Sequence, residues 1–448
     1  MIKKVLIANR GEIALRIART CRELGIGTVA AHSAADRDSA VVHFADRSIQ
    51  IGPGPAKSSY LFIPAIIEAA KATGADAIHP GYGFLSENED FAEICESENI
   101  TFIGTPAAVL GRLGDKAKAR AVMTDAGLPL LPGSRDALDG ARAAALADRI
   151  GYPVIMKAVA GGGGRGMSVV RDPADFAEAW ELTQSTAQAV FRDERLYVER
   201  YLDSVRHVEI QILADSHGNA VHLGSRDCSV QRRRQKLVEE SPAPRLPADM
   251  LADMGAAAVR GALAAGYVGA GTFEFLVDSD SRFYFMEVNC RLQVEHPVTE
   301  MVTGVDLVAE QLRIAAGEPL SFDQSDVHLN GVSIECRINA EDPARDFVPA
   351  AGLLTECQLP AGPFVRVDTH VYPGYRVPPF YDSLLAKVIV WAPTRDAAIA
   401  RMCRALGETR ISGPGVETTT SFLTGVMEHG QFRAAEHDTA FLESFTLV

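Results

Sequence analysis

Apolar segments and segments with helical spacing alternate along the first part of the chain. Apolar runs at 2–8 and 28–32 flank residues 12–24, whose apolar side chains recur at helical intervals before Gly25. The later segments continue the alternation: a helix near 62–72, a strand at 77–79, a helix after Ser86 and a strand at 101–103. Such alternation is typical of an open parallel sheet, so the sequence predicts an N-terminal α/β domain.

The pattern changes after about residue 113. Two Ala-rich helical stretches lead to an apolar strand and then a run of glycines: 115–127, 137–149, 154–156 and 161–164. Beyond Gly317 the chain has short apolar strands separated by Pro and Gly turns. The sequence therefore predicts two further domains, the last of them mostly β with a late helix, and a fold of mixed α/β and α+β class.

Composition excludes several classes of function. Hydrophobic residues make up 47% and charged residues 23% of the 448 residues, which is typical of a globular protein. The net charge of −14 opposes binding to nucleic acid. No apolar run approaches the roughly 18 residues that span a membrane, and we expect neither a signal peptide nor a membrane anchor. The seven cysteines form no C-x-x-C pair, which favours a cytoplasmic protein without zinc or disulfides.

A glycine-rich loop follows Lys157, and the apolar run 167–170 follows the loop. Consecutive glycines let several backbone N–H groups converge on an anion, so the loop suits a polyphosphate, although a simple hairpin turn has the same pattern. Neither a Gly-Lys-Ser/Thr sequence nor a G-x-G-x-x-G sequence after the first strand occurs. The loop therefore belongs to neither a Walker-type site nor a dinucleotide-binding fold.

Acidic residues lie on both strands of a predicted hairpin, 272–276 and 283–286. Glu274 is on the first strand and Glu287 follows the second. From there polar and apolar residues alternate strictly, and the polar ones are Glu287, Asn289, Arg291, Gln293 and Glu295. If the segment stays extended, this polar face is roughly 25 Å long at about 3.3 Å per residue. Glu274, Glu287 and Asn289 offer the oxygen ligands that Mg²⁺ prefers, so we expect them to bind metal. A half-exposed strand with paired charges is the alternative.

A basic cluster occupies residues 231–236, between Gln231 and Lys236. Glu239 and Glu240 follow it directly, and the chain as a whole is acidic. An internal anion-binding pocket therefore fits the cluster better than a nucleic-acid surface.

Together these segments resemble the biotin carboxylase family of ATP-grasp enzymes, over essentially the whole chain. The stretches that carry the resemblance are Ile7–Ala14, His79–Asn88, the glycine loop, Arg206–Glu209, Gly271–Phe275 and Gln293–Glu300.

The resemblance implies an N-terminal α/β domain at 1–113, an ATP-grasp domain at 114–331 with a mobile lid at about 130–203, and a C-terminal β-rich domain at 332–448. The implied substrates and cofactors are ATP, Mg²⁺ or Mn²⁺ as a pair of ions, bicarbonate and biotin. The residues implied to hold ATP are Lys116, Lys157, Gly163, Gly164, Glu199, Arg200, Tyr201, Leu202, His207, Gln231, Arg234, Leu276, Glu274 and Glu287. Metal would bind to Glu274, Glu287 and Asn289, bicarbonate to Lys236, Arg291, Gln293 and Val294, and biotin to Arg337 and Tyr82.

The implied reaction assigns catalytic roles to Glu295, Lys236, Arg291 and Arg337. Glu295 would take the proton of bicarbonate as it attacks the γ-phosphate of ATP. Lys236 and Arg291 would neutralise the carboxyphosphate that forms, and Arg337 would stabilise the biotin oxygen that becomes negative.

The chain departs from the family pattern at four positions. Arg234 replaces a usual histidine, Cys290 a threonine, Arg200 a frequent lysine and Ala160 a glycine. Arginine donates hydrogen bonds but cannot accept one, so the contact with the nucleotide is in doubt at Arg234. None of these changes removes a catalytic group.

Two other functions stay open on the sequence: a different ATP-grasp ligase that joins a carboxylate to an amine, and an inactive carboxylase-like subunit. Because no Met-Lys-Met segment for biotin attachment occurs, we expect the biotin on a separate carrier protein. The resemblance also implies carboxyltransferase partners and a homodimer. The sequence leaves the final acceptor of the carboxyl group open.

Overall fold

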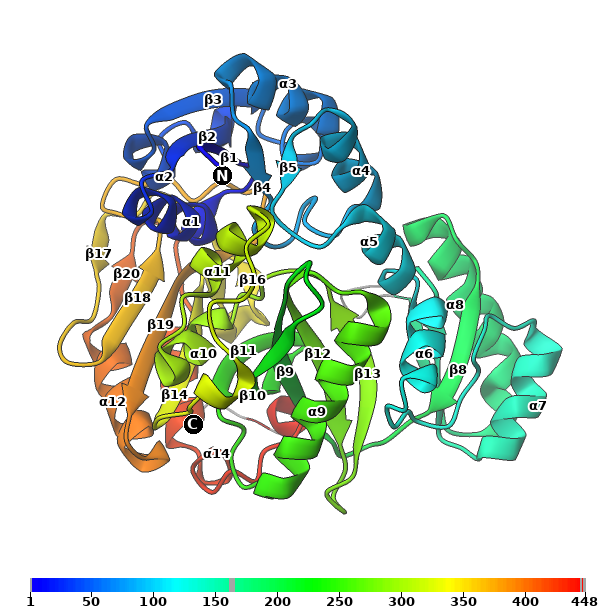
Figure 1. Ribbon diagram of the computed structural model, residues 1–448. Helices are drawn as coiled ribbons and strands as arrows, with labels where there is room; N and C mark the ends of the chain where they lie inside the picture. Colours follow the sequence, from blue (N-terminus) through cyan, green and yellow to red (C-terminus); the bar gives the residue numbers. More distant parts are fainter. Residues whose placement is uncertain (1, 161–165, 444, 446–448) are drawn as a thin grey trace.

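The computed structural model describes residues 2–160, 166–443 and 445 (Figure 1). Its N-terminal part contains the predicted parallel sheet, with strand order β3-β2-β1-β4-β5 and every neighbouring pair parallel. The strands are β1 (Lys4–Ile7), β2 (Gly27–Ser33), β3 (Arg47–Gly52), β4 (Ala77–His79) and β5 (Thr101–Phe102). The helices are α1 (Gly11–Glu23), α2 (Ala40–Phe44), α3 (Ile63–Thr73), α4 (Glu89–Ser97) and α5 (Ala107–Leu113). The α/β reading of this region is confirmed.

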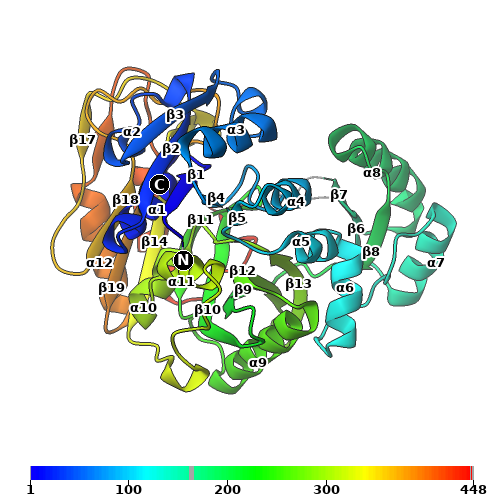
Figure 2. The same cartoon turned by 45° about the horizontal axis from the view of Figure 1, so that its top comes forward.

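A small antiparallel sheet with order β7-β6-β8 projects from one side of the molecule (Figures 1 and 2). Its strands are β6 (Val154–Ala158), β7 (Met167–Val170) and β8 (Leu196–Arg200), and helices α7 (Gly140–Ile150) and α8 (Phe176–Phe191) pack on it. Trp180 and Met156 are buried in its own apolar core. Gly163 and Gly164, which the sequence assigns to the nucleotide, lie outside the described residues.

The large sheet has the order β13-β12-β9-β10-β11-β14-β19-β18 and is antiparallel throughout. Its strands are β9 (Arg206–Ala214), β10 (Ala220–Arg232), β11 (Gln235–Ser241), β12 (Gly269–Val277), β13 (Phe283–Asn289), β14 (Val332–Asn339), β18 (Val365–Thr369) and β19 (Leu384–Ala392). The pairing of β11 with β14 carries this sheet across residue 331. Strands from the expected second and third domains thus share one sheet, and the boundaries at 113 and 331 stay predictions.

Helices cover the large sheet and the C-terminal region. They are α6 (Lys116–Asp125), α9 (Ala248–Ala265), α10 (His296–Thr303), α11 (Leu307–Ala315), α12 (Arg395–Glu408), α13 (Thr420–Glu428) and α14 (Gly430–Arg433). Short strands pair outside the sheet as β15 (Glu341–Asp342) with β16 (Val348–Pro349), and β17 (Glu356–Gln358) with β20 (Arg410–Ser412). The expected late helix after residue 332 is present as α12, and further helices follow it; Met402 on α12 and Leu423 on α13 share a core with β14 and β19.

Single helical turns of the 3-10 type complete the described chain. They are η1 (Ala34–Asp36), η2 (Ala56–Ser58), η3 (Pro173–Asp175), η4 (Gln324–Asp326), η5 (Pro343–Arg345) and η6 (Phe441–Glu443). Throughout the described ranges, we find no helix with the length and apolar character that crossing a membrane requires.

Candidate active site

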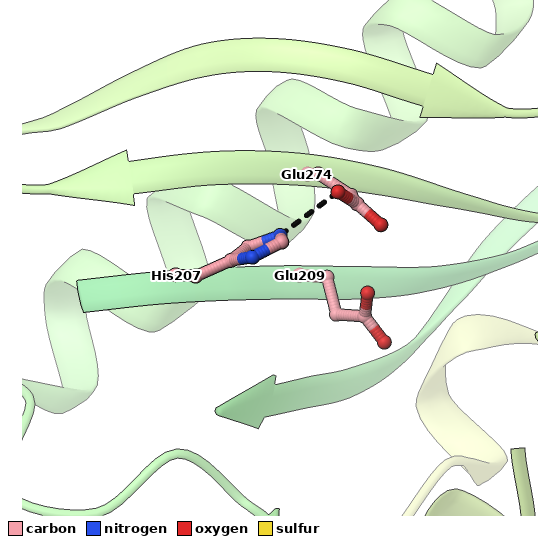
Figure 3. Close-up of side chains that lie close together, drawn as sticks. All are labelled: His207, Glu209 and Glu274. Carbon is pink, nitrogen blue, oxygen red and sulfur yellow. Dashed lines mark hydrogen bonds and ion pairs between the residues drawn. The ribbon is translucent and has the colours of Figure 1, made fainter. Parts of the chain in front are cut away.

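Adjacent strands of the large sheet place three functional side chains on one face. His207 and Glu209 alternate with apolar residues on β9, and Glu274 on β12 lies directly opposite Glu209. His207 Nε2 lies 2.8 Å from Glu274 Oε2 (Figure 3). Burial lowers the pKa of His207, but the Glu274 carboxylate outweighs burial and raises it above its usual value. Period-2 alternation in β9 therefore brings His207 and Glu209 to the same face of the sheet, where they meet Glu274.

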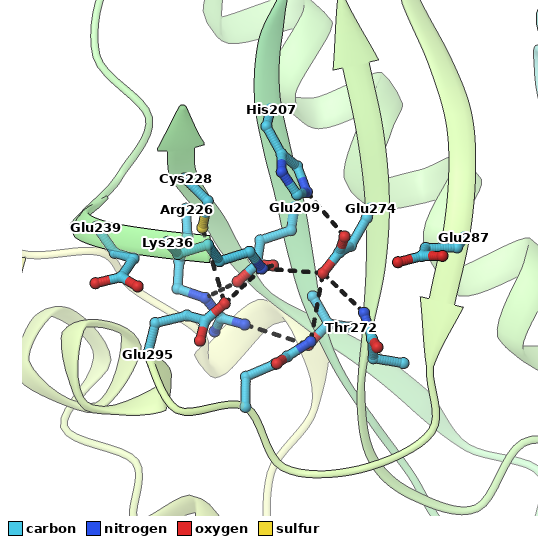
Figure 4. A network of polar contacts seen from close by, with 12 residues as sticks. His207, Glu209, Arg226, Cys228, Lys236, Glu239, Thr272, Glu274, Glu287 and Glu295 are labelled. Carbon is cyan, nitrogen blue, oxygen red and sulfur yellow. Dashed lines mark hydrogen bonds and ion pairs between the residues drawn. The ribbon is translucent and has the colours of Figure 1, made fainter. Parts of the chain in front are cut away.

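The Lys236 ammonium lies at the centre of this polar cluster (Figure 4). Its Nζ is 2.8 Å from Glu209 Oε2, 3.0 Å from Glu274 Oε1 and 2.6 Å from Glu295 Oε1. Burial works to lower the pKa of Lys236, but the surrounding acidic groups hold it well above its usual value. The lysine is therefore a fixed positive charge, which suits an anion binding beside it.

Arg226 is fully buried next to this cluster. Its guanidinium forms an ion pair with Glu209, and its Nη1 donates to Gln211 Oε1 at 2.7 Å and to Thr299 Oγ1 at 2.9 Å. Sequence reasoning missed both Arg226 and Glu209. The signal available was the alternation of His207, Glu209 and Gln211 with apolar residues along one strand.

The predicted metal ligands come together on the neighbouring edge of the sheet. Glu274 and Glu287 are cross-strand partners on β12 and β13. Asn289 Nδ2 donates to Glu274 Oε1 at 2.7 Å, and Glu287 forms an ion pair with Lys116, the first residue of α6. Two carboxylates side by side repel each other unless a cation lies near, and with an amide oxygen they form a hard-oxygen set. The donor set therefore fits a divalent cation.

The chain does not stay extended beyond Asn289, so the prediction of one straight polar face was wrong. β13 ends at Asn289, and α10 begins at His296 with Glu295 as its N-cap residue. Pro297 lies in the first turn of α10, a position that favours proline, and the chain must turn before it.

The turn nevertheless keeps the predicted side chains together. Arg291 Nη1 donates to Gln293 Oε1 at 2.7 Å, and its Nη2 donates to Asn289 Oδ1 at 3.3 Å. Glu87 accepts from Arg291 Nε at 2.8 Å and from the backbone N–H of Cys290 at 2.8 Å. A residue of the N-terminal region thus anchors the turn.

Glu295 is almost completely buried between two cations. Its Oε1 accepts from Lys236, and its Oε2 lies 2.9 Å from Arg337 Nη2. Burial would raise the pKa of Glu295, but Lys236 and Arg337 outweigh it and hold the pKa well below its usual range. Arg337 also forms an ion pair with Glu239 on the next strand. Glu295 is therefore ionised and able to accept a proton.

A second charged cluster lies on the small sheet. Lys157 Nζ on β6 is 2.5 Å from Glu199 Oε2 on β8, and Arg120 of α6 forms an ion pair with the same carboxylate. Lys116 interacts with acidic groups of both clusters. Burial works to lower its pKa, but the carboxylates, above all Glu287 and to a smaller extent Glu199, raise it. The nucleotide residues implied by the sequence are therefore divided between two sheets.

The other residues implied to contact the nucleotide lie around these clusters. Leu276 is opposite His207 in the sheet, and Gln231 Nε2 is 3.3 Å from His207 Nδ1. The side chain of Arg200 donates to the carbonyl oxygen of Ile150 at 3.0 Å, so it does not join Glu199. Tyr201 and Leu202 follow β8 directly, and the exposed Arg234 lies in the hairpin between β10 and β11.

Known protein families match nearly the whole chain. The family "Biotin carboxylase, N-terminal domain" matches residues 1–110, "Carbamoyl-phosphate synthase L chain, ATP binding domain" matches residues 115–322, and "Biotin carboxylase C-terminal domain" matches residues 335–444.

Relatives and solved structures are similar to this chain over nearly the full length of both chains. Biotin carboxylase 1 of Bacillus subtilis is 53% identical over 450 residues, 100% of each chain. The crystal structure of a biotin carboxylase β-γ-ATP complex from Campylobacter jejuni has a TM-score of 0.97 at 49% identity and covers 99% of both chains. The biotin carboxylase domain dimer of Hydrogenobacter thermophilus 2-oxoglutarate carboxylase, with MgADP, ADP and bicarbonate, has a TM-score of 0.96 at 47% identity, with 99% of this chain and 97% of that chain covered.

The small projecting sheet and the larger antiparallel sheet each carry a lysine bonded to a carboxylate, and with the matched ATP-binding domain they fit an ATP-grasp enzyme, an ATP-dependent ligase. The chain belongs to the biotin carboxylase family, and its reaction is the ATP-dependent carboxylation of biotin.

Proposed function

We propose that this site activates bicarbonate at Glu295 and transfers the carboxyl group to biotin held at Arg337 and Tyr82. One observation carries the proposal: the ionised Glu295 lies between Lys236 and Arg337 at the end of the turn that presents Arg291. The proton acceptor contacts both Lys236 and the Arg337 guanidinium, and Arg291 joins the same network through Gln293, whose Nε2 donates to Glu274. Bicarbonate would bind to Lys236, Arg291, Gln293 and the backbone of Val294.

The first step forms carboxyphosphate. A bicarbonate oxygen attacks the γ-phosphorus of ATP, Glu295 takes the bicarbonate proton, and the bond to ADP breaks. Lys236 is bonded to Glu295 before bicarbonate arrives. When this lysine turns to the anion, the carboxylate loses part of its stabilisation, and its proton affinity rises. Binding of the substrate would thus switch on the base.

The second step carboxylates biotin. Carboxyphosphate divides into CO₂ and phosphate, the phosphate takes the proton of the biotin ureido N–H, and the nitrogen attacks CO₂. Negative charge develops on the ureido oxygen during this attack, and the Arg337 guanidinium would stabilise it. Arg337 is fixed by Glu239 and Glu295, so little reorganisation is needed.

Nucleotide and metal would bind between the two sheets. Mg²⁺ at Glu274, Glu287 and Asn289 would supply positive charge against the phosphates of ATP. Lys116 and Lys157 would then exchange their present carboxylate partners for phosphate oxygens. The projecting segment at about 130–203 would act as the lid of the ATP-grasp domain at 114–331, between domains at 1–113 and 332–448.

The expected partners are a separate biotin carboxyl carrier protein, carboxyltransferase subunits and a second copy of the chain. The dimer of the related 2-oxoglutarate carboxylase domain supports the homodimer. No disulfide joins any of the seven cysteines, all of which the structure describes, and this supports our proposal of a cytoplasmic enzyme.

The direct test is carboxybiotin formation by the purified protein. Free biotin, MgATP and labelled bicarbonate should give labelled carboxybiotin and one ADP for each product molecule. ADP release without bicarbonate dependence, or label that stays in bicarbonate, would overturn the proposal.

A further inference from the structure

Lys387 is a fully buried lysine that none of the proposed steps uses. Its Nζ lies 2.8 Å from the carbonyl oxygen of Val294, 3.0 Å from Glu12 Oε1 and 3.9 Å from Asp368 Oδ2. Burying an ammonium costs several kcal/mol unless acceptors surround it. The acceptors here include the backbone of the turn that precedes Glu295, so the lysine contacts the structure that carries the base.

The position of Lys387 in the sheet places it beside the proposed biotin residue. Lys387 on β19 is the cross-strand partner of Arg337 on β14. Cross-strand partners have neighbouring side chains on the same face of the sheet. Arg337 contacts the carboxylate of Glu295, while Lys387 contacts the backbone just before that residue. Two adjacent cations therefore fix Glu295, one at its carboxylate and the other at the preceding peptide unit.

Glu12 extends this contact to the N-terminal region. It lies in the first turn of α1, is buried, and belongs to the Ile7–Ala14 stretch, for which the proposed reaction has no role. Its Oε1 accepts from Lys387 and from the hydroxyl of Tyr82. Tyr82, Glu12, Lys387 and Val294 thus form one continuous chain of contacts between the proposed biotin and bicarbonate positions.

The charges that face Lys387 keep it protonated. They are the carboxyl groups of Glu12 on α1, Glu335 on β14 and Asp368 on β18, while Arg337 on β14 and His296 at the start of α10 also face the lysine but add no negative charge. Burial works to lower the pKa of Lys387, but Glu12 and Glu335 outweigh burial and raise it. The charged ammonium can therefore donate to the Val294 carbonyl, from which it lies 2.8 Å.

We propose that Lys387 and Glu12 are a positioning pair for the carboxylation reaction. A peptide unit is planar and trans, so the carbonyl of Val294 and the N–H of Glu295 point in opposite directions. Lys387 fixes that carbonyl, and with it the orientation of the Glu295 N–H and the origin of the Glu295 side chain. Glu12 meanwhile fixes the Tyr82 hydroxyl for biotin. This inference rests on the proposed roles of Val294, Glu295 and Tyr82.

The test is the kinetics of the K387M and E12Q variants with each substrate varied separately. K387M keeps the length of the side chain but loses the ammonium, and it should raise the KM for bicarbonate about tenfold and lower kcat. Its KM for MgATP should stay within about twofold of the wild-type value, because Lys387 contacts no proposed nucleotide residue. E12Q retains an acceptor oxygen for Lys387, so it should affect the KM for biotin more than the KM for bicarbonate.

Arg395, the first residue of α12, offers a matched control. Its Nε lies 2.7 Å from Glu240 Oε2, and its Nη2 donates to the carbonyl oxygen of Phe432 at 2.7 Å, so it has the same kinds of acceptor as Lys387. R395M should lower the thermal midpoint and leave the KM for bicarbonate unchanged. If K387M does not fold, the K387M/E12Q variant, which removes both buried charges, is measured instead.

The outcomes separate this inference from the proposed function. A normal KM for bicarbonate in K387M or K387M/E12Q, or an equal rise in the KM for MgATP, would overturn the positioning role. An E295Q variant that carboxylates biotin at the wild-type rate would instead overturn the function on which it rests.

Discussion

The two charged clusters of the site differ in how firmly they are held. On the large sheet, Lys236 and Glu295 belong to a continuous network that runs from β9 to β19 and reaches the N-terminal region. On the small sheet, Lys157 and Glu199 form a compact cluster with Arg120. An isolated bridge between Leu130 and Phe285, with the ion pair of Lys116 and Glu287, links the second cluster to the edge strand β13.

This difference separates two tasks. Bicarbonate and biotin are small and must meet in one geometry, and the residues proposed to bind them belong to the network in which several contacts fix each side chain. ATP must enter before the reaction and ADP must leave afterwards, and the proposed lid would allow both, because part of the proposed nucleotide site lies on the projecting unit. Substitutions in the first cluster should therefore act on the chemical steps, and those in the second on nucleotide binding.

The sharpest test of the first cluster is E295Q. The amide keeps the shape of the side chain but cannot take the bicarbonate proton, and carboxylation should fall by about 10³-fold or more. Binding of MgATP, measured by calorimetry, should change less than about twofold. A large loss of affinity for MgATP would show that Glu295 serves nucleotide binding rather than proton transfer.

R337A should reduce the biotin step by about 10²-fold, because it removes the donor to the developing oxyanion. It also leaves Glu239 buried without its ion pair. The double variant R337A/E239Q should therefore recover thermal stability without recovering activity. Recovery of both would show that Arg337 is only structural.

K157M tests the second cluster. It should raise the KM for MgATP about tenfold and leave the KM for bicarbonate unchanged. Steady-state kinetics with each substrate varied will measure both values. A rise in the KM for bicarbonate alone would mean that the second cluster binds bicarbonate rather than the nucleotide.

The pH dependence of stability should reveal the buried carboxyl group of Glu239 beside the first cluster. Burial raises the pKa of Glu239 to about 7, although Arg337 opposes the shift. A folded-state pKa above the unfolded value gives a contribution to stability that is full below about pH 4.5 and is lost as the pH rises through about 7. Between these values E239Q should lessen the fall of the unfolding free energy by up to about 1.4 kcal/mol per pH unit. Denaturant unfolding at several pH values measures this, and identical slopes would refute it.

The smallest effect is expected at the hairpin that carries Gln231 and Lys236. Asp346 forms ion pairs with both Arg232 and Arg233, and its side chain is 73% exposed. Exposed pairs contribute little, so D346N should cost less than about 1 kcal/mol and change kcat less than about twofold. A larger loss of kcat would show that the ion pairs of Asp346 position this hairpin for the reaction.

Local patterns in the sequence were sufficient for much of the fold. Helical spacing and apolar runs predicted the parallel N-terminal sheet, and two neighbouring apolar runs predicted the hairpin of β12 and β13, in which the structure places Glu274 opposite Glu287. These features depend on residues close together in the chain. The turn after Asn289 was missed because strict alternation continues through it, although Pro297 marked the coming helix.

Contacts between distant segments could not be predicted in the same way. Glu209 lies opposite Glu274, and Lys387 opposite Arg337, only because of the order of strands in the sheet. Strand order is a property of the whole chain and leaves no mark on local spacing. Resemblance to a family supplied Lys236 and Arg337, while Arg226, Lys387 and Glu12 became visible as site residues only in three dimensions.

The central claim is that bicarbonate itself attacks ATP at Glu295. Bicarbonate labelled with ¹⁸O tests this directly, because the attacking oxygen stays on phosphorus when carboxyphosphate divides into CO₂ and phosphate. The wild-type enzyme with MgATP and biotin should release phosphate that contains one labelled oxygen, as measured by mass spectrometry. Phosphate without label would contradict the account, because water rather than bicarbonate would then have attacked the nucleotide.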